Sequence, residues 1–266
     1  MCWLPKLFGK RVVVTVHGLD WQREKWKGGF GAWYIRMGEK MAVRFADEMI
    51  VLSRSVQQYF QKTYGRDTVW IPNGVQKPEI VAAEQIRAQF GIEKKDYILF
   101  LGRLVPEKGV HTLLEAFSHV NTSKKLVIAG SPSDSEDYGI RLRKMAQADD
   151  RVLFTGFVQG QLLKELYSNA YVYVLPSSVE GMPLSLLEAM SYGNCCVVSD
   201  IPECREVVQD KAVTFPAGNR SALTEVLQSL CDVPDTVEMY RANAQRYICG
   251  KYNWDDVTEK TLELYQ

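Results

Sequence analysis

Residues 180–188 read Glu-Gly-Met-Pro-Leu-Ser-Leu-Leu-Glu and place a turn with a proline between two carboxylates. The apolar run before them, at 171–175, predicts a buried strand. Residues 184–192 predict a helix that ends at Gly193, and Pro183 fits the first helical position because that position needs no N–H donor. The order strand, turn, helix is the unit from which open α/β sheets are built.

The two carboxylates of this stretch fall on different elements. Glu180 is expected in a loop at the carboxyl end of the strand, and Glu188 on the helix that follows. Open α/β sheets bind ligands at that edge, where a helix start offers N–H groups to a phosphate and a carboxylate can accept hydrogen bonds from ribose hydroxyls. This chemistry suits a nucleotide sugar or a relative of one. The alternative is a solvated helix start with two surface acids.

Length and composition narrow the class of protein. The chain has 266 residues, enough for one large or two modest domains. Its 32 basic and 32 acidic residues balance, so no net field favours nucleic acid as a partner. The six cysteines show no C-x-x-C pairing, and Cys195 and Cys196 fall in an apolar strand pattern, so we expect one or both to be core residues. This usage favours a reducing cytosol over a disulfide scaffold.

No apolar run reaches the roughly 18 residues that a membrane-spanning helix needs. Residues 1–11 mix basic and apolar side chains but lack the apolar segment of a signal peptide. We favour a short helix that leads into a strand, and peripheral contact with an anionic membrane is the alternative. The expected location is therefore the cytoplasm, with the inner face of the membrane left open. The sequence does not indicate the oligomeric state.

Strand and helix patterns alternate along the chain. Strands are predicted at 11–16, 48–52, 68–71, 97–101, 125–129, 152–155, 171–175, 195–198 and 213–215, and helices at 32–46, 55–64, 82–90, 110–120, 138–148, 161–169, 183–192, 222–231, 236–249 and 254–265. The alternation predicts an α/β protein with two Rossmann-like doubly wound domains. We place the first at 1–77 and the second at 78–250, with a C-terminal helix at 251–266 that packs back on the first part. Three strands make the first domain incomplete for its type.

The turn after the strand at 97–101 carries a cluster of cations. Residues 102–109 read Gly-Arg-Leu-Val-Pro-Glu-Lys-Gly. Arg103 can hold phosphate oxygens with two N–H groups, and Lys108 adds a mobile point charge. Such cations stabilise a diphosphate that gains negative charge as it leaves. The turn is neither a Walker A loop nor a G-x-G-x-x-G loop. The alternative is an exposed helix start in which Glu107 faces the helix dipole.

Other strand ends carry further candidates. Gly130 follows the strand at 125–129, where a glycine permits close approach of a ligand, and a plain turn explains this glycine nearly as well. Val158 follows the strand at 152–155, and His17 ends the first strand before a glycine. The loop at 20–27, rich in Trp, Lys and Arg, either shapes an acceptor site or is simply solvated. No Asp-x-Asp motif stands at a strand end, so we expect no metal.

These motifs resemble those of the retaining glycosyltransferases of family 4, which have the two-domain GT-B fold. The paired glutamates Glu180 and Glu188 match, as does the turn at 102–109. Val-His-Gly-Leu-Asp-Trp at 16–21 and Ile-Pro-Asn-Gly-Val at 71–75 also match. In the family these two lie midway through and at the end of the N-terminal domain. The resemblance, which runs from about 12 to 265, therefore implies that the opening βαβαβ part of that domain is absent, through truncation or a misassigned start.

The resemblance assigns roles to these residues. It implies that Glu188 holds the ribose hydroxyls, that Glu180 and His17 contact the donor sugar, and that the diphosphate lies on the turn at 102–109. The implied nucleotide-sugar site comprises Gly102, Arg103, Lys108, Gly130, Val158, Glu180, Gly181, Met182, Pro183, Leu184 and Glu188. The residues that the resemblance implies in the reaction itself are His17, Arg103, Lys108 and Glu180.

The implied activity is transfer of a sugar from a nucleotide-diphosphate sugar to a glycan or lipid-linked acceptor. The family retains the anomeric configuration, uses no cofactor beyond the donor substrate and is generally metal-independent. Two alternatives stay open. One is a remnant that binds nucleotide but lacks a complete acceptor site. The other is a GT-B-like enzyme of a different kind, an epimerase or a phosphorylase.

Overall fold

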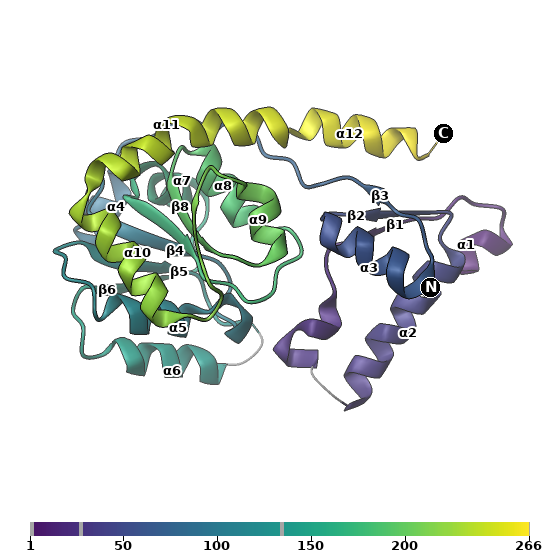
Figure 1. Cartoon of the computed structure of the whole chain (residues 1–266), viewed down its shortest axis with the longest axis horizontal. Coiled ribbons are helices and arrows are strands. Elements are labelled where there is room, and N and C mark those ends of the chain that lie inside the picture. Colours follow the sequence, from purple (N-terminus) through teal and green to yellow (C-terminus); the bar gives the residue numbers. More distant parts are fainter. Residues whose placement is uncertain (1–2, 27–28, 134–135, 266) are drawn as a thin grey trace. The chain divides into compact units, whose positions relative to one another are not determined.

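The computed structural model describes residues 3–26, 29–133 and 136–265 (Figure 1). The chain divides into two compact units. Unit 1 comprises Met1–Gly74, Val179–Pro183 and Tyr252–Gln266, and unit 2 comprises Val75–Ser178 and Leu184–Lys251. Each unit has a parallel sheet with helices, so the predicted α/β class is confirmed.

Unit 1 is built, in its described part, on a parallel sheet of order β1-β2-β3. The strands are β1 (Val13–Val16), β2 (Glu48–Val51) and β3 (Val69–Trp70); the helices are α1 (Trp3–Leu7), α2 (Gly29–Phe45), α3 (Arg54–Tyr64) and α12 (Trp254–Glu263). Of the two serines at the start of α3, Ser53 and Ser55, Ser53 caps the helix, because its hydroxyl accepts a hydrogen bond of 3.4 Å from the Val56 N–H.

The loop predicted at 20–27 has local structure that the sequence does not predict. It contains two short 3-10 turns, η1 (Asp20–Gln22) and η2 (Glu24–Trp26). Such turns need only a few local i to i+3 hydrogen bonds, and they leave no periodic pattern in the sequence. Residues 27–28 lie outside the described part of the chain.

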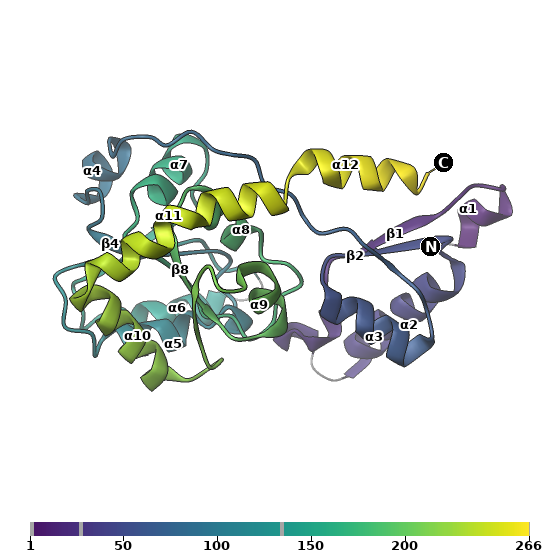
Figure 2. The ribbon, with the colours of Figure 1, turned by 45° about the horizontal axis from the view of Figure 1, so that its top comes forward.

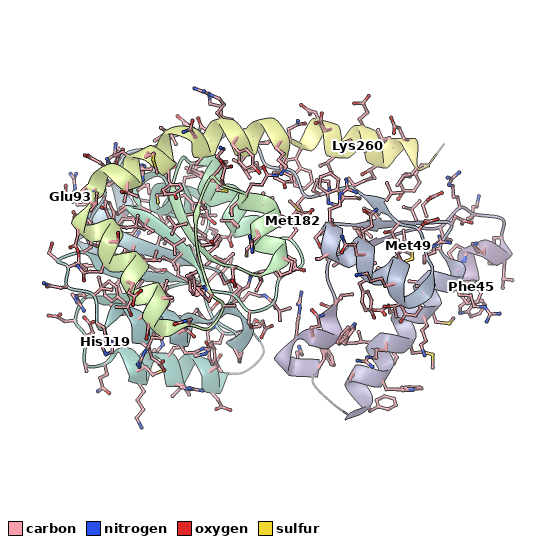
Figure 3. All side chains as sticks on the ribbon, viewed as in Figure 1. Phe45, Met49, Glu93, His119, Met182 and Lys260 are labelled. Carbon is pink, nitrogen blue, oxygen red and sulfur yellow. The ribbon has the colours of Figure 1, made fainter. Side chains whose placement is uncertain are left out.

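The core of unit 1 forms where α2 and α3 pack on β2. Its buried side chains are Ala42, Ala46, Met49, Val51, Val56 and Phe60. Figure 3 labels Met49 on β2 and Phe45 at the end of α2. Beside this core, Glu39 of α2 accepts hydrogen bonds from the hydroxyls of Tyr59 at 2.7 Å and Tyr64 at 2.5 Å. These bonds join α2 to α3 through a charged acceptor, which makes them stronger than neutral ones.

Unit 2 is built, in its described part, on a parallel sheet of order β6-β5-β4-β7-β8-β9. The strands are β4 (Tyr97–Leu101), β5 (Lys125–Ala129), β6 (Val152–Gly156), β7 (Val172–Leu175), β8 (Cys195–Ser199) and β9 (Val213–Phe215). The helices are α4 (Gln85–Phe90), α5 (Val110–Phe117), α6 (Glu136–Ala146), α7 (Gly160–Asn169), α8 (Leu184–Ser191), α9 (Pro202–Val208), α10 (Arg220–Asp232) and α11 (Pro234–Lys251), with the 3-10 turn η3 (Pro106–Lys108) before α5.

The chain reverses its direction of winding between β4 and β7. From β4 it runs through β5 to β6, with α5 and α6 on one face of the sheet, and it then returns to β7 beside β4 (Figure 1). Figure 2 shows α7 and α8 on the opposite face. This arrangement follows from the right-handed crossovers that parallel strands require. The carboxyl ends of β4 and β7 therefore flank a topological switch point, where doubly wound sheets bind ligands.

The central strands of unit 2 are buried on both faces. Tyr97 to Phe100 of β4 and Cys195 to Val198 of β8 are at most 1% exposed. Continuous apolar runs of this kind are typical of parallel strands covered by helices. The prediction that Cys195 and Cys196 are core residues is confirmed, and burial raises the pKa of the Cys195 thiol to about 12. None of the described helices is both long and apolar enough to cross a bilayer.

Candidate active site

The β4–α5 turn lies at the carboxyl edge of the sheet and is tied to the neighbouring strand ends. Gly102 donates its N–H to the Ala129 carbonyl at 3.0 Å, and Leu104 donates to that of Ser131 at 3.0 Å. Gly130 donates in turn to the Gly156 carbonyl at 2.8 Å. Three predicted ligand-contact positions are thus brought together: Gly102, Arg103 and Gly130. The Arg103 side chain is exposed, and that of Lys108 is half-buried in η3.

The loop after β7 packs against this turn. The Glu107 carbonyl accepts hydrogen bonds from the Ser178 N–H at 2.8 Å and the Ser178 hydroxyl at 3.3 Å. Gly109 has φ +67°, and a Cβ placed on it would overlap the carbonyl oxygen of Pro176. Only a glycine allows this approach, because an L side chain is both strained at that φ and blocked by the oxygen. The loop that leads to the paired glutamates is therefore held against the cation-bearing turn.

The burial of Glu107 argues against one interpretation of the sequence. The alternative of an exposed helix start expected this carboxylate in solvent, but its side chain is only 7% exposed. Within the described residues its Oε1 has no hydrogen-bond partner. A buried acceptor of this kind is costly to leave unsatisfied, so the interior of the turn is not an ordinary solvated helix start.

Glu188 lies on α8, as predicted, and is half-buried. The Tyr167 hydroxyl donates a hydrogen bond of 2.9 Å to its Oε2. Burial raises the pKa of Glu188, and this hydrogen bond acts in the opposite direction. Nearby, Tyr173 of β7 shares a hydrogen bond of 2.8 Å with the Ser185 hydroxyl. Tyr173 thus fixes the first turn of α8 through Ser185, and Tyr167 orients the Glu188 carboxylate.

Glu180 lies in a loop, as predicted, and with Gly181, Met182 and Pro183 it belongs to unit 1. A Cβ on Gly181 would overlap the His17 carbonyl oxygen, so this loop packs against the end of β1. The Asn73 N–H donates to the Met182 sulfur at 3.1 Å, and Figure 3 labels Met182. The exposed His17 side chain therefore shares one region of unit 1 with the loop at 180–183.

The structure adds detail for three residues of the predicted site: Pro183, Leu184 and Val158. Helix α8 begins at Leu184, so Pro183 directly precedes the helix instead of opening it. Leu184 is 48% exposed at that helix start, whereas Val158, after β6, is 8% exposed. Val158 can therefore contribute through its backbone more readily than through its side chain. That all the predicted residues of both units line a single cleft stays a prediction.

Sequence reasoning missed the residues that position the site. Tyr167 and Ser178 had no motif to mark them, because their partners lie 21 and 71 residues away in sequence. One weak signal was available for Tyr167. It is a large aromatic residue with a polar tip in the helix predicted at 161–169, and tyrosine hydroxyls that become buried usually find a hydrogen-bond partner.

Two models of known protein families match the chain. A model described as "Glycosyl transferases group 1" matches residues 82–247. The chain belongs to this family. A second model, described as "Glycosyltransferase Family 4", matches residues 1–77. Among the described residues, no group of three or more His, Cys, Asp or Glu side chains is placed to hold a metal ion.

Two curated relatives illustrate the similarity. The alpha-maltose-1-phosphate synthase of Mycolicibacterium smegmatis is 28% identical, over 98% of this chain and 74% of the relative. The O-antigen chain mannosyltransferase RfbU of Salmonella typhimurium is 28% identical, over 80% of this chain and 59% of the relative. The chain thus spans between about half and three quarters of the lengths of the curated relatives that it matches.

Solved structures share the fold. Sucrose-phosphate synthase from Thermosynechococcus elongatus superposes with a TM-score of 0.85 and 24% identity, over 99% of this chain and 70% of that chain. Anabaena Alr3699/HepE in complex with UDP-glucose gives a TM-score of 0.86 at 19% identity, over 98% of this chain and 74% of that chain. The predicted GT-B fold is confirmed.

Proposed function

We propose that the protein transfers a sugar from a nucleotide-diphosphate sugar to a glycan or lipid-linked acceptor, with retention of anomeric configuration and without a metal. The observation that carries the proposal is the packing at the switch point of unit 2. There the Arg103 and Lys108 turn is joined to the loop after β7 through Ser178 and Glu107. The HepE complex with UDP-glucose, which has the same fold, supports a nucleotide sugar as donor.

In this proposal the cations of the turn bind the donor diphosphate. Arg103 is exposed and follows Gly102, whose carbonyl oxygen occupies the space that a Cβ on Gly130 would need, so Gly130 lets the two strand ends pack closely beside Arg103. Lys108 adds a second charge from η3. As the bond between the sugar and the phosphate breaks, negative charge develops on the leaving oxygen, and both cations stabilise that charge. The cations would thereby supply the charge stabilisation that a bound metal supplies elsewhere.

The remaining residues orient the donor. Glu188, held by Tyr167, accepts hydrogen bonds from the ribose hydroxyls, and Glu180 and His17 contact the sugar. The acceptor hydroxyl attacks the anomeric carbon on the face from which the diphosphate departs. One C–O bond forms as the other breaks, and the acceptor's proton moves to the leaving phosphate oxygen. No protein side chain is then needed as a general base.

A transfer assay tests this proposal. The protein is incubated with UDP-glucose, GDP-mannose or ADP-glucose and a panel of soluble and lipid-linked acceptors, with EDTA in parallel reactions. We expect one donor to give a product whose anomeric configuration, read by proton NMR, equals that of the donor, at a rate that EDTA does not change. An inverted product would refute retention. Nucleotide binding without any product would favour the remnant, and conversion of a donor in the absence of acceptor would favour an epimerase.

A further inference from the structure

A second pocket of unit 2 lies away from the turn that carries Arg103. It has a volume of about 460 Å³, within the roughly 300–1,000 Å³ range typical of small-molecule sites. The side chains that matter for its chemistry are Lys77, Tyr192, Arg241, Gln245, Arg246 and Cys249. They come from the segment before α4, the residues after α8, and α11.

The pocket lies at the opposite edge of the sheet from the proposed donor site. Arg241 contacts the backbone of Ala170 and Tyr171, which directly precede β7, and Gly193 lies just before β8. These are the amino ends of the strands, whereas Gly102 and Gly130 follow the carboxyl ends of β4 and β5. A phosphate held by Arg241 would therefore lie at the opposite edge of the sheet from the diphosphate of the proposed function, although Tyr192 of the pocket stacks at 5.2 Å on Tyr167, which holds Glu188.

The charged side chains that line the pocket are all positive. Three cations line it, Lys77, Arg241 and Arg246, and no carboxylate does. Across the part of the chain that the structure describes, none of the three forms an ion pair. Other cations of unit 2 do find partners: Lys95 pairs with Glu238 at 2.8 Å and Arg151 with Asp149 at 2.7 Å. Glu238, one turn before Arg241 on α11, interacts electrostatically with Arg241 but does not line the pocket. In a chain whose formal net charge is zero, a concave site lined by three positive charges and no carboxylate selects anions.

The pocket is also preorganised. Arg241 donates from Nη1 to the carbonyl oxygens of Ala170 at 2.9 Å and Tyr171 at 3.4 Å. These neutral acceptors fix the guanidinium group without neutralising its charge. Gln245 is fixed in the same way, because its Nε2 donates to the Ser191 carbonyl at 2.7 Å. Side chains that are ordered before binding lose less conformational entropy when a ligand arrives.

We propose that this pocket binds a phosphate-bearing small molecule. Arg241 and Arg246 would bind phosphate oxygens through their planar N–H groups, which match phosphate geometry, and Lys77 would add a mobile charge. Tyr192 and the adjacent Ile80 offer apolar surface to the rest of the ligand. Three positive charges suit a dianionic phosphate or a diphosphate better than a single carboxylate.

Calorimetric titration with inorganic pyrophosphate tests the proposal in an Arg103→Ala/Lys108→Ala background, which removes the cations of the proposed donor site. We expect saturable binding at one site. Adding Lys77→Gln/Arg246→Gln to this background should weaken the affinity for pyrophosphate at least tenfold. The matched control, Lys144→Gln/Lys164→Gln, removes two exposed positive charges elsewhere in unit 2 and should change the affinity less than about twofold.

Two results would overturn the proposal: absence of pyrophosphate binding in this background, or equal affinity in the pocket variant and the control. A co-sedimentation assay with phosphatidylglycerol vesicles distinguishes a soluble ligand from a lipid headgroup. Vesicle binding that the pocket variant loses, with no binding of pyrophosphate, would also contradict the small-molecule assignment. The background variant makes the outcome independent of the proposed transferase activity, since the titration needs neither nucleotide nor acceptor.

Discussion

At the scale of single residues, Glu188 combines a cost to stability with a proposed role in binding. Burial on α8 raises the pKa of its carboxyl group, so the folded protein holds that proton more tightly than the unfolded chain does. Its contribution to stability is therefore fully present at low pH and is lost as the pH rises through the raised pKa. At neutral pH the ionised carboxylate is kept in the fold at some expense, which is typical of functional positions.

Glu188→Gln should separate these two effects. Near pH 5, just above the ordinary pKa of a glutamate, less of this contribution is lost than at pH 8, so the difference in free energy of unfolding between the variant and the wild type should be smaller there. As the pH rises to 8 the variant should become the more stable protein, by up to about 1 kcal/mol, because it has no carboxylate to ionise. Urea unfolding at the two pH values measures this difference. Glu225→Gln, which changes an exposed glutamate of α10, is the control and should show no such trend. The quantity that decides is the stability of Glu188→Gln relative to the wild type. A fall in this relative stability between pH 5 and pH 8 would contradict the argument.

At the scale of elements, the contact between the β4–α5 turn and the loop after β7 decides the geometry of the site. Gly109 makes this contact possible, since a Cβ there would overlap the Pro176 carbonyl oxygen. The Ser178 hydrogen bonds to Glu107 then hold the two segments together. A change that pushes them apart should affect ligand binding as well as stability.

Gly109→Ala should destabilise the protein by about 2–4 kcal/mol, through the positive φ and the steric overlap together. Gly218→Ala is a matched control in the same unit: its φ is +73°, but a Cβ there meets nothing within 4 Å. The control should cost only about 1 kcal/mol. Thermal unfolding and nucleotide titration measure both effects. Equal losses of stability in the two variants, with unchanged nucleotide affinity, would show that the close approach has no importance.

Most of the strands of unit 2 could be predicted to within a residue, because β4, β5, β7 and β8 are continuous apolar runs bounded by turn residues. Helix α9 was missed. It is short and begins at Pro202, although a proline at the first position and Glu203 in the first turn are recognised start signals. The candidate site residues can be recognised from the sequence because the members of each motif lie close together in the chain. The contacts of Tyr167 with Glu188 and of Ser178 with Glu107 depend on how crossovers pack, which local patterns do not encode.

At the scale of the whole molecule, the two units differ in a way that helps experiments. The six tryptophans, at positions 3, 21, 26, 33, 70 and 254, all belong to unit 1. Intrinsic tryptophan fluorescence therefore reports on the folding of unit 1. The described sheet of unit 2 has six strands against three in unit 1, so far-UV circular dichroism weights unit 2 more heavily. Together the two signals verify that a variant is folded in both units before its ligand binding is compared.

The central claim is that the carboxyl edge of β4 and β7 binds the diphosphate of a nucleotide. Isothermal titration of the wild type with UDP, GDP and ADP tests it most directly, against Arg103→Ala/Lys108→Ala and the control Lys144→Ala/Lys164→Ala. We predict that at least one nucleotide binds the wild type and the control alike, and that the Arg103→Ala/Lys108→Ala variant binds it at this edge about 100-fold more weakly, because two charge-assisted contacts are lost. The titrations are repeated with Lys77→Gln/Arg246→Gln added to each protein, which removes the diphosphate binding proposed for the second pocket. Equal affinity in that variant and the wild type, with both units folded, would contradict the account.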